Sequence, residues 1–170
     1  MPMSNKNECV VIYSGGTDST CTAALMAEKY KKVHLLTFFE KGTEETPSPS
    51  KNVARLQKHF GSEKFSHQML STDKLVKKIS YDHYFRFLLR HRFFMLSTCG
   101  FSSLSWHVRT IIYCLENNIM SVADGLTREL MHFPGHMDVI IKEFQKLYQA
   151  FGIQYTNPVR DWDTPRDHSF

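Results

Sequence analysis

The sequence lacks closely spaced pairs of cysteines. Its 170 residues include four cysteines, at positions 9, 21, 99 and 114. These scattered positions lack the CxxC spacing of zinc sites and do not suit a disulfide framework. We therefore expect no zinc and a reducing compartment.

Long apolar runs and strong charge are missing too. No apolar run approaches the roughly 20 residues that cross a bilayer, and the first residues, MPMSNKNE, lack the apolar stretch of a signal peptide. The net charge of +4 suits phosphorylated ligands but does not require a nucleic-acid partner. Without internal repeats, the chain is expected to be one cytoplasmic domain over residues 1–170, with no membrane partner and an irregular tail over 155–170.

A phosphate-binding pattern stands near the start of the chain. In residues 10–20, VVIYSGGTDST, a short apolar strand breaks into a Ser and Gly turn that opens a helix. Gly15 and Gly16 let the backbone adopt positive φ and let a phosphate approach without an intervening Cβ. The helix start offers unsatisfied N–H groups and the positive end of the helix dipole. This pattern predicts a phosphate site, although a turn without a ligand would look the same.

Asp18 indicates the kind of phosphate. The loop is shorter than the phosphate loops of kinases and GTPases and lacks their Lys. A carboxylate repels a bare phosphate, but it can hold a Mg²⁺ that is bound to one. Asp18 is therefore the candidate Mg²⁺ ligand, and the alternative is an anion that stabilises the helix N-terminus.

The segment SGGTDST resembles the SGGxDS loop of the PP-loop ATP pyrophosphatases, which include GMP synthetase, NAD synthetase and tRNA thiolation enzymes. The resemblance implies that the loop binds the β- and γ-phosphates of ATP. It also implies that ATP is cleaved between its α- and β-phosphates to adenylate a substrate. Thr37, Phe38 and Phe39 resemble the adenine-binding segment of this family. The other expected ATP contacts around the loop are Tyr13, Ser14, Gly15, Gly16, Thr17, Asp18, Ser19 and Thr20.

Strands and helices alternate along the chain. Short apolar runs predict strands at 9–13, 32–39, 64–69, 119–123 and 153–155, and longer apolar patterns predict helices at 18–30, 50–60, 104–115 and 140–151. This alternation is typical of an α/β fold, a doubly wound parallel sheet with helices on both faces. The family resemblance implies five strands in the order 3-2-1-4-5, with the fourth strand beside the first.

Ligands of such sheets bind at the carboxyl ends of the strands, where the strand order reverses. The loop after the fourth strand, Asp124–Glu129, is then expected to face SGGTDST across a crevice. Gly125 would let the backbone approach a ribose or phosphate, unless it is a simple turn glycine. Arg128, with Lys41 behind it, is the candidate cation for the leaving pyrophosphate, unless it is a solvated loop residue. Asp18, Arg128 and Lys41 are thus the expected catalytic residues, with ATP and Mg²⁺ as cofactors.

Within the superfamily, two stretches resemble the 7-cyano-7-deazaguanine synthases of queuosine biosynthesis. They are residues 9–42 and, more weakly, residues 122–138, VADGLTRELMHFPGHMD. Those synthases carry a C-terminal cluster of four zinc-binding cysteines, and this tail has none. The resemblance therefore implies the ATP chemistry of the superfamily and leaves the acceptor open. Further candidates for the acceptor pocket are Cys99, His107, Arg109, His132 and His136. The alternative is that Cys99 is a buried small residue and that the others are core or surface residues.

A helix is also predicted over residues 81–96, with an apolar face opposite a basic one that includes Arg86 and Arg90. The basic face could contact RNA, with Phe87 and Phe94 stacking on bases. The alternatives are a solvated surface and a dimer interface. A homodimer is expected because two-fold dimers are the commonest oligomers.

The main hypothesis is an AMP-forming enzyme of the ligase type that adenylates a carboxylate or carbonyl oxygen of a small acceptor and releases pyrophosphate. It would act in nucleobase, queuosine-type or tRNA-modification metabolism. Two alternatives remain. A tRNA thiolation-type ligase predicts that helix 81–96 binds tRNA, and a regulatory module would bind ATP without turnover.

Overall fold

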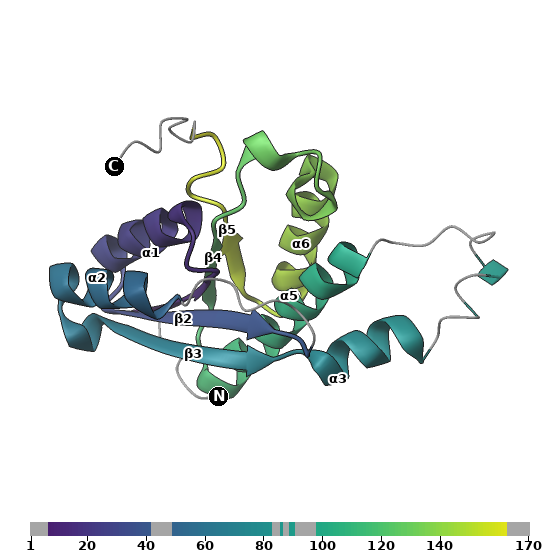
Figure 1. Cartoon of the computed structure of the whole chain (residues 1–170), viewed down its shortest axis with the longest axis horizontal. Coiled ribbons are helices and arrows are strands. Elements are labelled where there is room, and N and C mark those ends of the chain that lie inside the picture. Colours follow the sequence, from purple (N-terminus) through teal and green to yellow (C-terminus); the bar gives the residue numbers. More distant parts are fainter. Residues whose placement is uncertain (1–6, 42–48, 83–85, 87–88, 91–97, 163–170) are drawn as a thin grey trace.

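A parallel sheet of five strands, in the order β3-β2-β1-β4-β5, runs through the molecule (Figure 1). The computed structural model describes residues 7–41, 49–82, 86, 89–90 and 98–162. The predicted α/β fold and strand order are confirmed. The strands are β1 (Glu8–Ile12), β2 (Lys32–Phe39), β3 (Phe65–Ser71), β4 (Ser121–Asp124) and β5 (Gln154–Thr156).

Helices connect the strands and cover both faces of the sheet (Figure 1). On one face lie α1 (Thr17–Lys29) and α2 (Ser50–Phe60), and on the other α5 (Thr98–Asn117) and α6 (Asp138–Ala150). The shorter helical elements are α3 (Asp73–Val76) with a π-helical continuation η2 (Lys77–Tyr81), and the 3₁₀ turns η1 (Ser62–Lys64), η3 (Arg128–Leu130) and η4 (Pro134–His136). No described helix has the length and apolar character that a membrane crossing needs.

Each face of the sheet has its own apolar core, and β1 contributes to both. Cys9 and Val11 belong to the core with α1 and α2, whereas Val10 belongs to the core with α5 and α6. Successive side chains of a strand point to opposite faces, so a central strand covered on both sides is apolar throughout. This is why the apolar run before the glycine turn predicts β1 well.

The predicted boundaries agree closely for β2 and α2, and less well elsewhere. Gly61 ends α2 with a φ of 103°, a backbone conformation that favours glycine. Helix α5 begins several residues before the predicted start, because its first turns are rich in Gly and Ser and carry no apolar period. In the predicted irregular tail, residues 155 and 156 belong to β5 and the described remainder forms turns. Most of helix 81–96 and the Cys99 side chain lie outside the described residues.

Candidate functional site

The loops after β1 and β4 leave the sheet side by side at its carboxyl edge. In the parallel β1–β4 pair, Ile12 is opposite Asp124, and each is the last residue of its strand. From β1 the chain first builds outward through β2 and β3, and then returns to β4 on the other side of β1. The strand order therefore reverses here, which is where open α/β sheets bind ligands.

Gly125 brings the β4 loop into contact with the start of α1. A Cβ at Gly125 would lie 2.7 Å from the Ser19 nitrogen and 2.9 Å from the Asp18 carbonyl carbon. Because these are backbone atoms, a side chain at this position would push the two segments apart. Gly125 thus keeps the two loops together, and its approach to a ribose or phosphate stays a prediction.

The predicted phosphate loop, residues 14–19, begins with a tight turn that packs against the start of α2. Gly15 has a φ of +83°, and a Cβ there would lie 2.7 Å from the Pro49 Cα. The side-chain amide of Asn52 donates a hydrogen bond to the Gly15 carbonyl at 2.8 Å. The sequence analysis assigned no role in the site to Pro49 or Asn52.

Side-chain hydroxyl groups form hydrogen bonds with the backbone of the glycine turn. Ser14 Oγ accepts the Gly16 N–H at 3.3 Å, and the Ser19 and Thr20 hydroxyls donate to the Gly16 carbonyl at 3.1 and 2.7 Å. Tyr13 extends this set, with its hydroxyl 3.2 Å from Thr20 Oγ1. The N-cap position of α1 is Gly16, which has no side chain to cap the helix. A helix N-terminus of this kind carries the positive end of the helix dipole, which favours an anion.

The two loop glycines are expected to respond differently to alanine. Gly15→Ala combines a positive φ with a Pro49 contact of 2.7 Å and should lower the free energy of unfolding by about 1–3 kcal/mol. Gly16→Ala should leave stability nearly unchanged, because its φ is −76° and its nearest neighbour is Ser14 Oγ at 3.5 Å. Both should weaken ATP binding, since each adds a Cβ to the phosphate loop. Urea unfolding and calorimetric titration with ATP measure the two effects, and unimpaired ATP binding by Gly16→Ala would contradict the assignment of the loop.

Asp18 lies in the first turn of α1 beside Thr17, the first residue of that helix. Within the described part of the chain, no group of three or more His, Cys, Asp and Glu side chains is placed to hold a metal ion. Mg²⁺ in nucleotide sites is typically held by one or two carboxylates together with phosphate oxygens and water. A single carboxylate on a phosphate loop therefore fits Mg²⁺ that arrives with a polyphosphate.

Near the end of β2, Phe38 lies beyond the last residue pair that β2 forms with β1. The last paired residues are Ile12 and Leu36, and the Tyr13 N–H still reaches the Leu36 carbonyl at 2.8 Å. Backbone groups of alternate residues point to the same side of a strand, so those of Phe38 point to the same side as those of Leu36, toward β1. The Thr37 hydroxyl instead donates to the Tyr13 carbonyl at 2.7 Å. Of the expected adenine-binding segment, Phe38 is the residue best placed to use its backbone.

At its carboxyl end, β2 also contacts the residues that begin α3. The Phe39 carbonyl accepts the Thr72 N–H at 3.1 Å, and the Lys41 N–H donates to Asp73 Oδ1 at 2.8 Å. Lys41 also lines a hollow of about 580 Å³ between α3 and α5. Its action on a leaving pyrophosphate stays a prediction.

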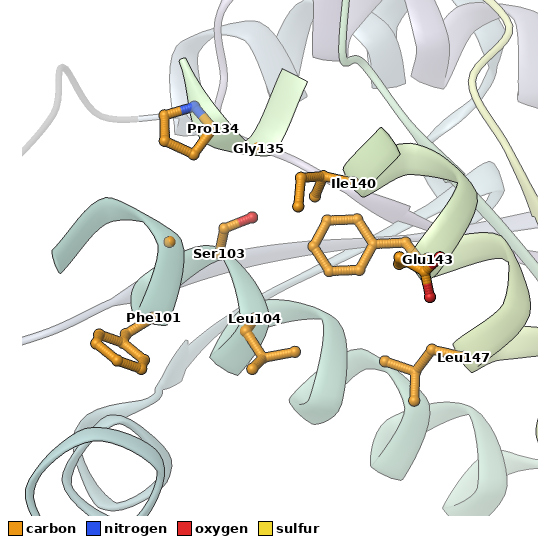
Figure 2. A pocket seen from close by; sticks show the side chains of 10 residues that line it. Phe101, Ser103, Leu104, Pro134, Gly135, Ile140, Glu143 and Leu147 are labelled. Carbon is orange, nitrogen blue, oxygen red and sulfur yellow. The ribbon is translucent and has the colours of Figure 1, made fainter. Parts of the chain in front are cut away.

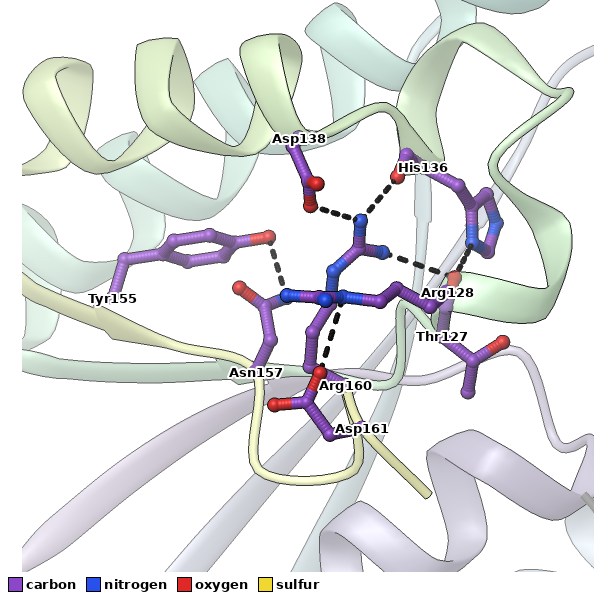
Figure 3. Close-up of polar contacts among 8 residues, drawn as sticks. All are labelled: Thr127, Arg128, His136, Asp138, Tyr155, Asn157, Arg160 and Asp161. Carbon is purple, nitrogen blue, oxygen red and sulfur yellow. Dashed lines mark hydrogen bonds and ion pairs between the residues drawn. The ribbon is translucent and has the colours of Figure 1, made fainter. Parts of the chain in front are cut away.

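Arg128 lies at the start of η3 and faces the segment after β5 (Figure 3). Its Nε is 3.1 Å from Asp161 Oδ1, and both side chains are largely exposed. An exposed pair of this kind contributes little to stability, so the arginine can exchange this partner for a phosphate. Its predicted catalytic role is untested by this geometry.

Arg160, a buried arginine after β5, holds the loop that follows β4 (Figure 3). Its Nη1 donates to the Thr127 carbonyl at 3.0 Å and its Nη2 to the His136 carbonyl at 2.7 Å. Nη2 is also 2.6 Å from Asp138 Oδ1. The His136 ring joins the same group, with Nδ1 at 3.1 Å from the Thr127 carbonyl. Arg160 therefore closes residues 127–138 into a fixed loop, a role that the sequence did not predict for this residue.

Asp124 belongs to a buried polar cluster between β4, β5, α5 and α6. Its Oδ2 accepts the Tyr155 hydroxyl at 3.3 Å and lies 3.8 Å from His107 Nε2. On its other side, His107 Nδ1 is 3.1 Å from the Tyr148 hydroxyl. Burial raises the pKa of Asp124 to about 7 and lowers the pKa of His107 to about 3. Over mildly acidic pH the pair is thus neutral rather than ionic, and His107 is a core residue.

Asp124→Asn is expected to change how stability depends on pH. The folded protein keeps a proton on Asp124 that the unfolded chain loses above the ordinary pKa of 3.8, so this group lowers stability as the pH rises from about 4 to about 7. The Asn variant lacks this loss. Its unfolding free energy relative to wild type should therefore grow by up to about 1.4 kcal/mol per pH unit.

Urea unfolding of both proteins across this pH range measures the difference. The effect of His107 has the opposite sign and is present in both proteins, so it cancels. A difference that does not vary with pH would show that Asp124 is ionised in the folded protein throughout.

Comparisons with known proteins address the fold. Residues 8–81, from β1 to the end of η2, match the family described as "Queuosine biosynthesis protein QueC". A comparison with curated proteins gives no match. Among solved structures, a predicted subunit of tRNA methyltransferase from Methanocaldococcus jannaschii is similar, with a TM-score of 0.50 and 19% identity over 92% of this chain and 69% of that chain. NMN synthetase from Francisella tularensis gives a TM-score of 0.44 and 12% identity over 86% of this chain and 62% of that chain. At 19% identity, the likeness to the tRNA methyltransferase subunit concerns the fold alone.

Proposed function

We propose that the chain, whose residues 8–81 match the QueC family and whose sheet has the order β3-β2-β1-β4-β5, is an ATP-using PP-loop enzyme of queuosine-type metabolism. The proposed reaction cleaves ATP between its α- and β-phosphates and adenylates a carboxylate or carbonyl oxygen of a small acceptor. The observation that carries the proposal is the glycine turn of residues 14–16, which opens α1 at the point where the strand order reverses.

The proposed chemistry is a substitution at phosphorus. An acceptor oxygen forms a bond to the α-phosphorus, the bond to the bridging oxygen breaks, and pyrophosphate leaves with that electron pair. The residues around the loop act by holding and neutralising charge. The first amides of α1 hold the β- and γ-phosphates, and Arg128, with Lys41, faces the charge that develops on the leaving group. Mg²⁺ held by Asp18 supplies further positive charge when it is bound.

The loop braced by Arg160 has a separate task in this proposal. Residues 127–138 follow shortly after the Gly125 contact with α1, so this loop lies on the β4 side of β1, away from β2. Its fixed shape would hold Arg128 and the acceptor at constant distance from the phosphates. Such positioning can supply a large part of a rate enhancement without any group that reacts.

Pyrophosphate release in the presence of ATP, Mg²⁺ and single heterocyclic carboxylates tests the proposed function. We expect release that depends on one acceptor and stops when Mg²⁺ is chelated. ATP binding without release under any acceptor would favour a regulatory module. Release that requires tRNA, with binding that weakens steeply with salt, would favour the thiolation-type ligase.

A further inference from the structure

Two hollows of the molecule differ in the side chains that line them. A cavity of about 320 Å³ between α5, η4 and α6 has mainly apolar walls, as Figure 2 shows. The other hollow, of about 580 Å³, lies between α3 and α5 at the carboxyl ends of β2 and β3, and charged side chains form much of its lining. Both volumes fall in the range of small-molecule sites. The charged hollow is the one whose lining indicates a class of ligand.

Three cationic side chains from separate parts of the chain line the charged hollow. Lys41 follows β2, Lys74 belongs to α3 and Arg109 belongs to α5. Within the part of the chain that the structure describes, neither lysine is part of an ion pair. Positive charges that share one concave surface repel one another, and such a surface attracts negative ions. The hollow therefore favours an anionic ligand.

Arg109 has unused capacity to bind an anion. Its side chain is 25% exposed, and its one ion pair among the described residues is with Glu116, at 3.5 Å between Nη1 and Oε2. The Glu116 side chain is 58% exposed, and a long contact with such an exposed partner contributes little to stability. A guanidinium has five N–H donors in a planar fork that matches the oxygens of a phosphate. Arg109 can therefore exchange Glu116 for a phosphate.

The second carboxylate of the lining, Asp73, has a structural role. It accepts the Lys41 N–H at 2.8 Å and the Ser71 hydroxyl at 2.7 Å, and these hydrogen bonds lower its pKa. Asp73 is thus ionised at neutral pH and joins the end of β2 to the start of α3, which keeps Lys41 near Lys74. Three cations and two carboxylates leave the lining with a surplus of positive charge.

Apolar side chains lie beside the cations. Leu75 from α3 and Ile112 from α5 also line the hollow, and Ile112 is 36% exposed. Ile112 is three residues after Arg109, so both side chains are on the same face of α5. A ligand that reaches Arg109 can therefore cover this apolar surface with a ring or hydrocarbon portion, and burial of apolar surface is favourable.

We propose that the charged hollow binds a small phosphate monoester, with the phosphate on Arg109 and the two lysines and the organic portion over Leu75 and Ile112. A monoester phosphate carries close to two negative charges at neutral pH, whereas each phosphate of a nucleic-acid backbone carries one. Three cations in one concave site suit a single doubly charged group. No residue of the phosphate loop lines the hollow, so this site is separate from the proposed ATP site and goes beyond the proposed function. Lys41 is the one residue that the two proposals share.

Phenyl phosphate is a suitable probe because it joins a monoester phosphate to a small apolar ring. Titration of the isotope-labelled protein, followed by NMR, should shift the backbone amide resonances of α3 and of residues 109–116. Arg109→Met should weaken this binding at least about tenfold, because hydrogen bonds to a charged group are the stronger ones. Arg55→Met is the matched control and should leave binding unchanged, since Arg55 is exposed on α2, which covers the other face of the sheet. If Arg109→Met does not fold, Lys74→Met, at an exposed position, makes the same test.

Two further titrations test the chemical class of the ligand. Phenol, which has the ring without the phosphate, should not shift these resonances, and inorganic phosphate should shift them only at higher concentration. Absence of phenyl phosphate binding, equal binding of phenol or by Arg109→Met, or shifts confined to residues 14–20 would overturn the proposal. A single-stranded RNA that shifts the same amides and displaces phenyl phosphate would overturn it in favour of nucleic acid. None of these outcomes involves ATP turnover, so this proposal and the proposed function can fail independently.

Discussion

Asp18→Asn is expected to lower Mg²⁺-dependent ATP turnover by about 10²–10³-fold, the usual effect of removing one preorganised electrostatic contact. The reason is the position of the carboxylate in the first turn of α1, directly after the phosphate loop. The Asn side chain has nearly the same shape as Asp and keeps one of its two oxygens. The substitution removes the negative charge that attracts the metal ion. Turnover should respond to higher Mg²⁺ concentration in the variant, whereas ATP binding without Mg²⁺ should not weaken.

Stability distinguishes the two interpretations of Asp18. An anion that only complements the helix dipole would contribute about 0.3–1 kcal/mol, and its loss would leave turnover unchanged. Asp82→Asn serves as the control, because Asp82 is an exposed carboxylate outside the phosphate loop. Steady-state turnover and urea unfolding of both variants decide the question. Normal Mg²⁺-dependent turnover by Asp18→Asn would contradict the metal role.

Arg160→Met is expected to lower the free energy of unfolding by about 3 kcal/mol, because charged donors to buried groups contribute about 1.5–3 kcal/mol each. Met keeps much of the volume but leaves the carbonyls of Thr127 and His136 without this donor. The loop over residues 127–138 should then exchange its amide hydrogens faster. Turnover should fall as well, while ATP binding by the phosphate loop remains.

Arg128→Met is the matched control for this prediction. The Arg128 side chain is 56% exposed and its Asp161 partner 73% exposed, so the substitution should cost under about 1 kcal/mol of stability. Its turnover should nevertheless fall if Arg128 faces the leaving pyrophosphate. Equal losses of stability in the two variants, measured by urea unfolding, would show that Arg160 does not brace the loop.

The parts of the fold that follow from local pattern could be predicted from the sequence. Residues 9–12 of β1 form an unbroken apolar run because helices cover both faces of the sheet, and the glycine turn after them is visible in the sequence. Gly61 marks the end of α2 for the same local reason. The place of β4 beside β1 came from the family resemblance, and with it the expectation that two loops meet at the carboxyl edge.

The contacts that brace the site join residues far apart in the sequence. Asn52 and Gly15 are separated by 37 residues, and Arg160 and Thr127 by 33. No periodic pattern in the sequence indicates that either pair is in contact. Arg160 stands in a polar segment, so from the sequence it resembles a solvated surface residue. His107 shows the opposite case, since it was a candidate for the acceptor pocket and is a buried core residue that packs against Phe144.

A crystal structure with Mg²⁺ and a non-hydrolysable ATP analogue tests the central claim most directly. We expect the β- and γ-phosphates on the backbone amides at the start of α1, with Mg²⁺ about 2.1 Å from an Asp18 oxygen, the distance usual for this ion. The adenine should lie beside the backbone of Phe38. A nucleotide bound away from residues 14–19, or phosphates on the loop with Mg²⁺ held by other residues, would contradict the account.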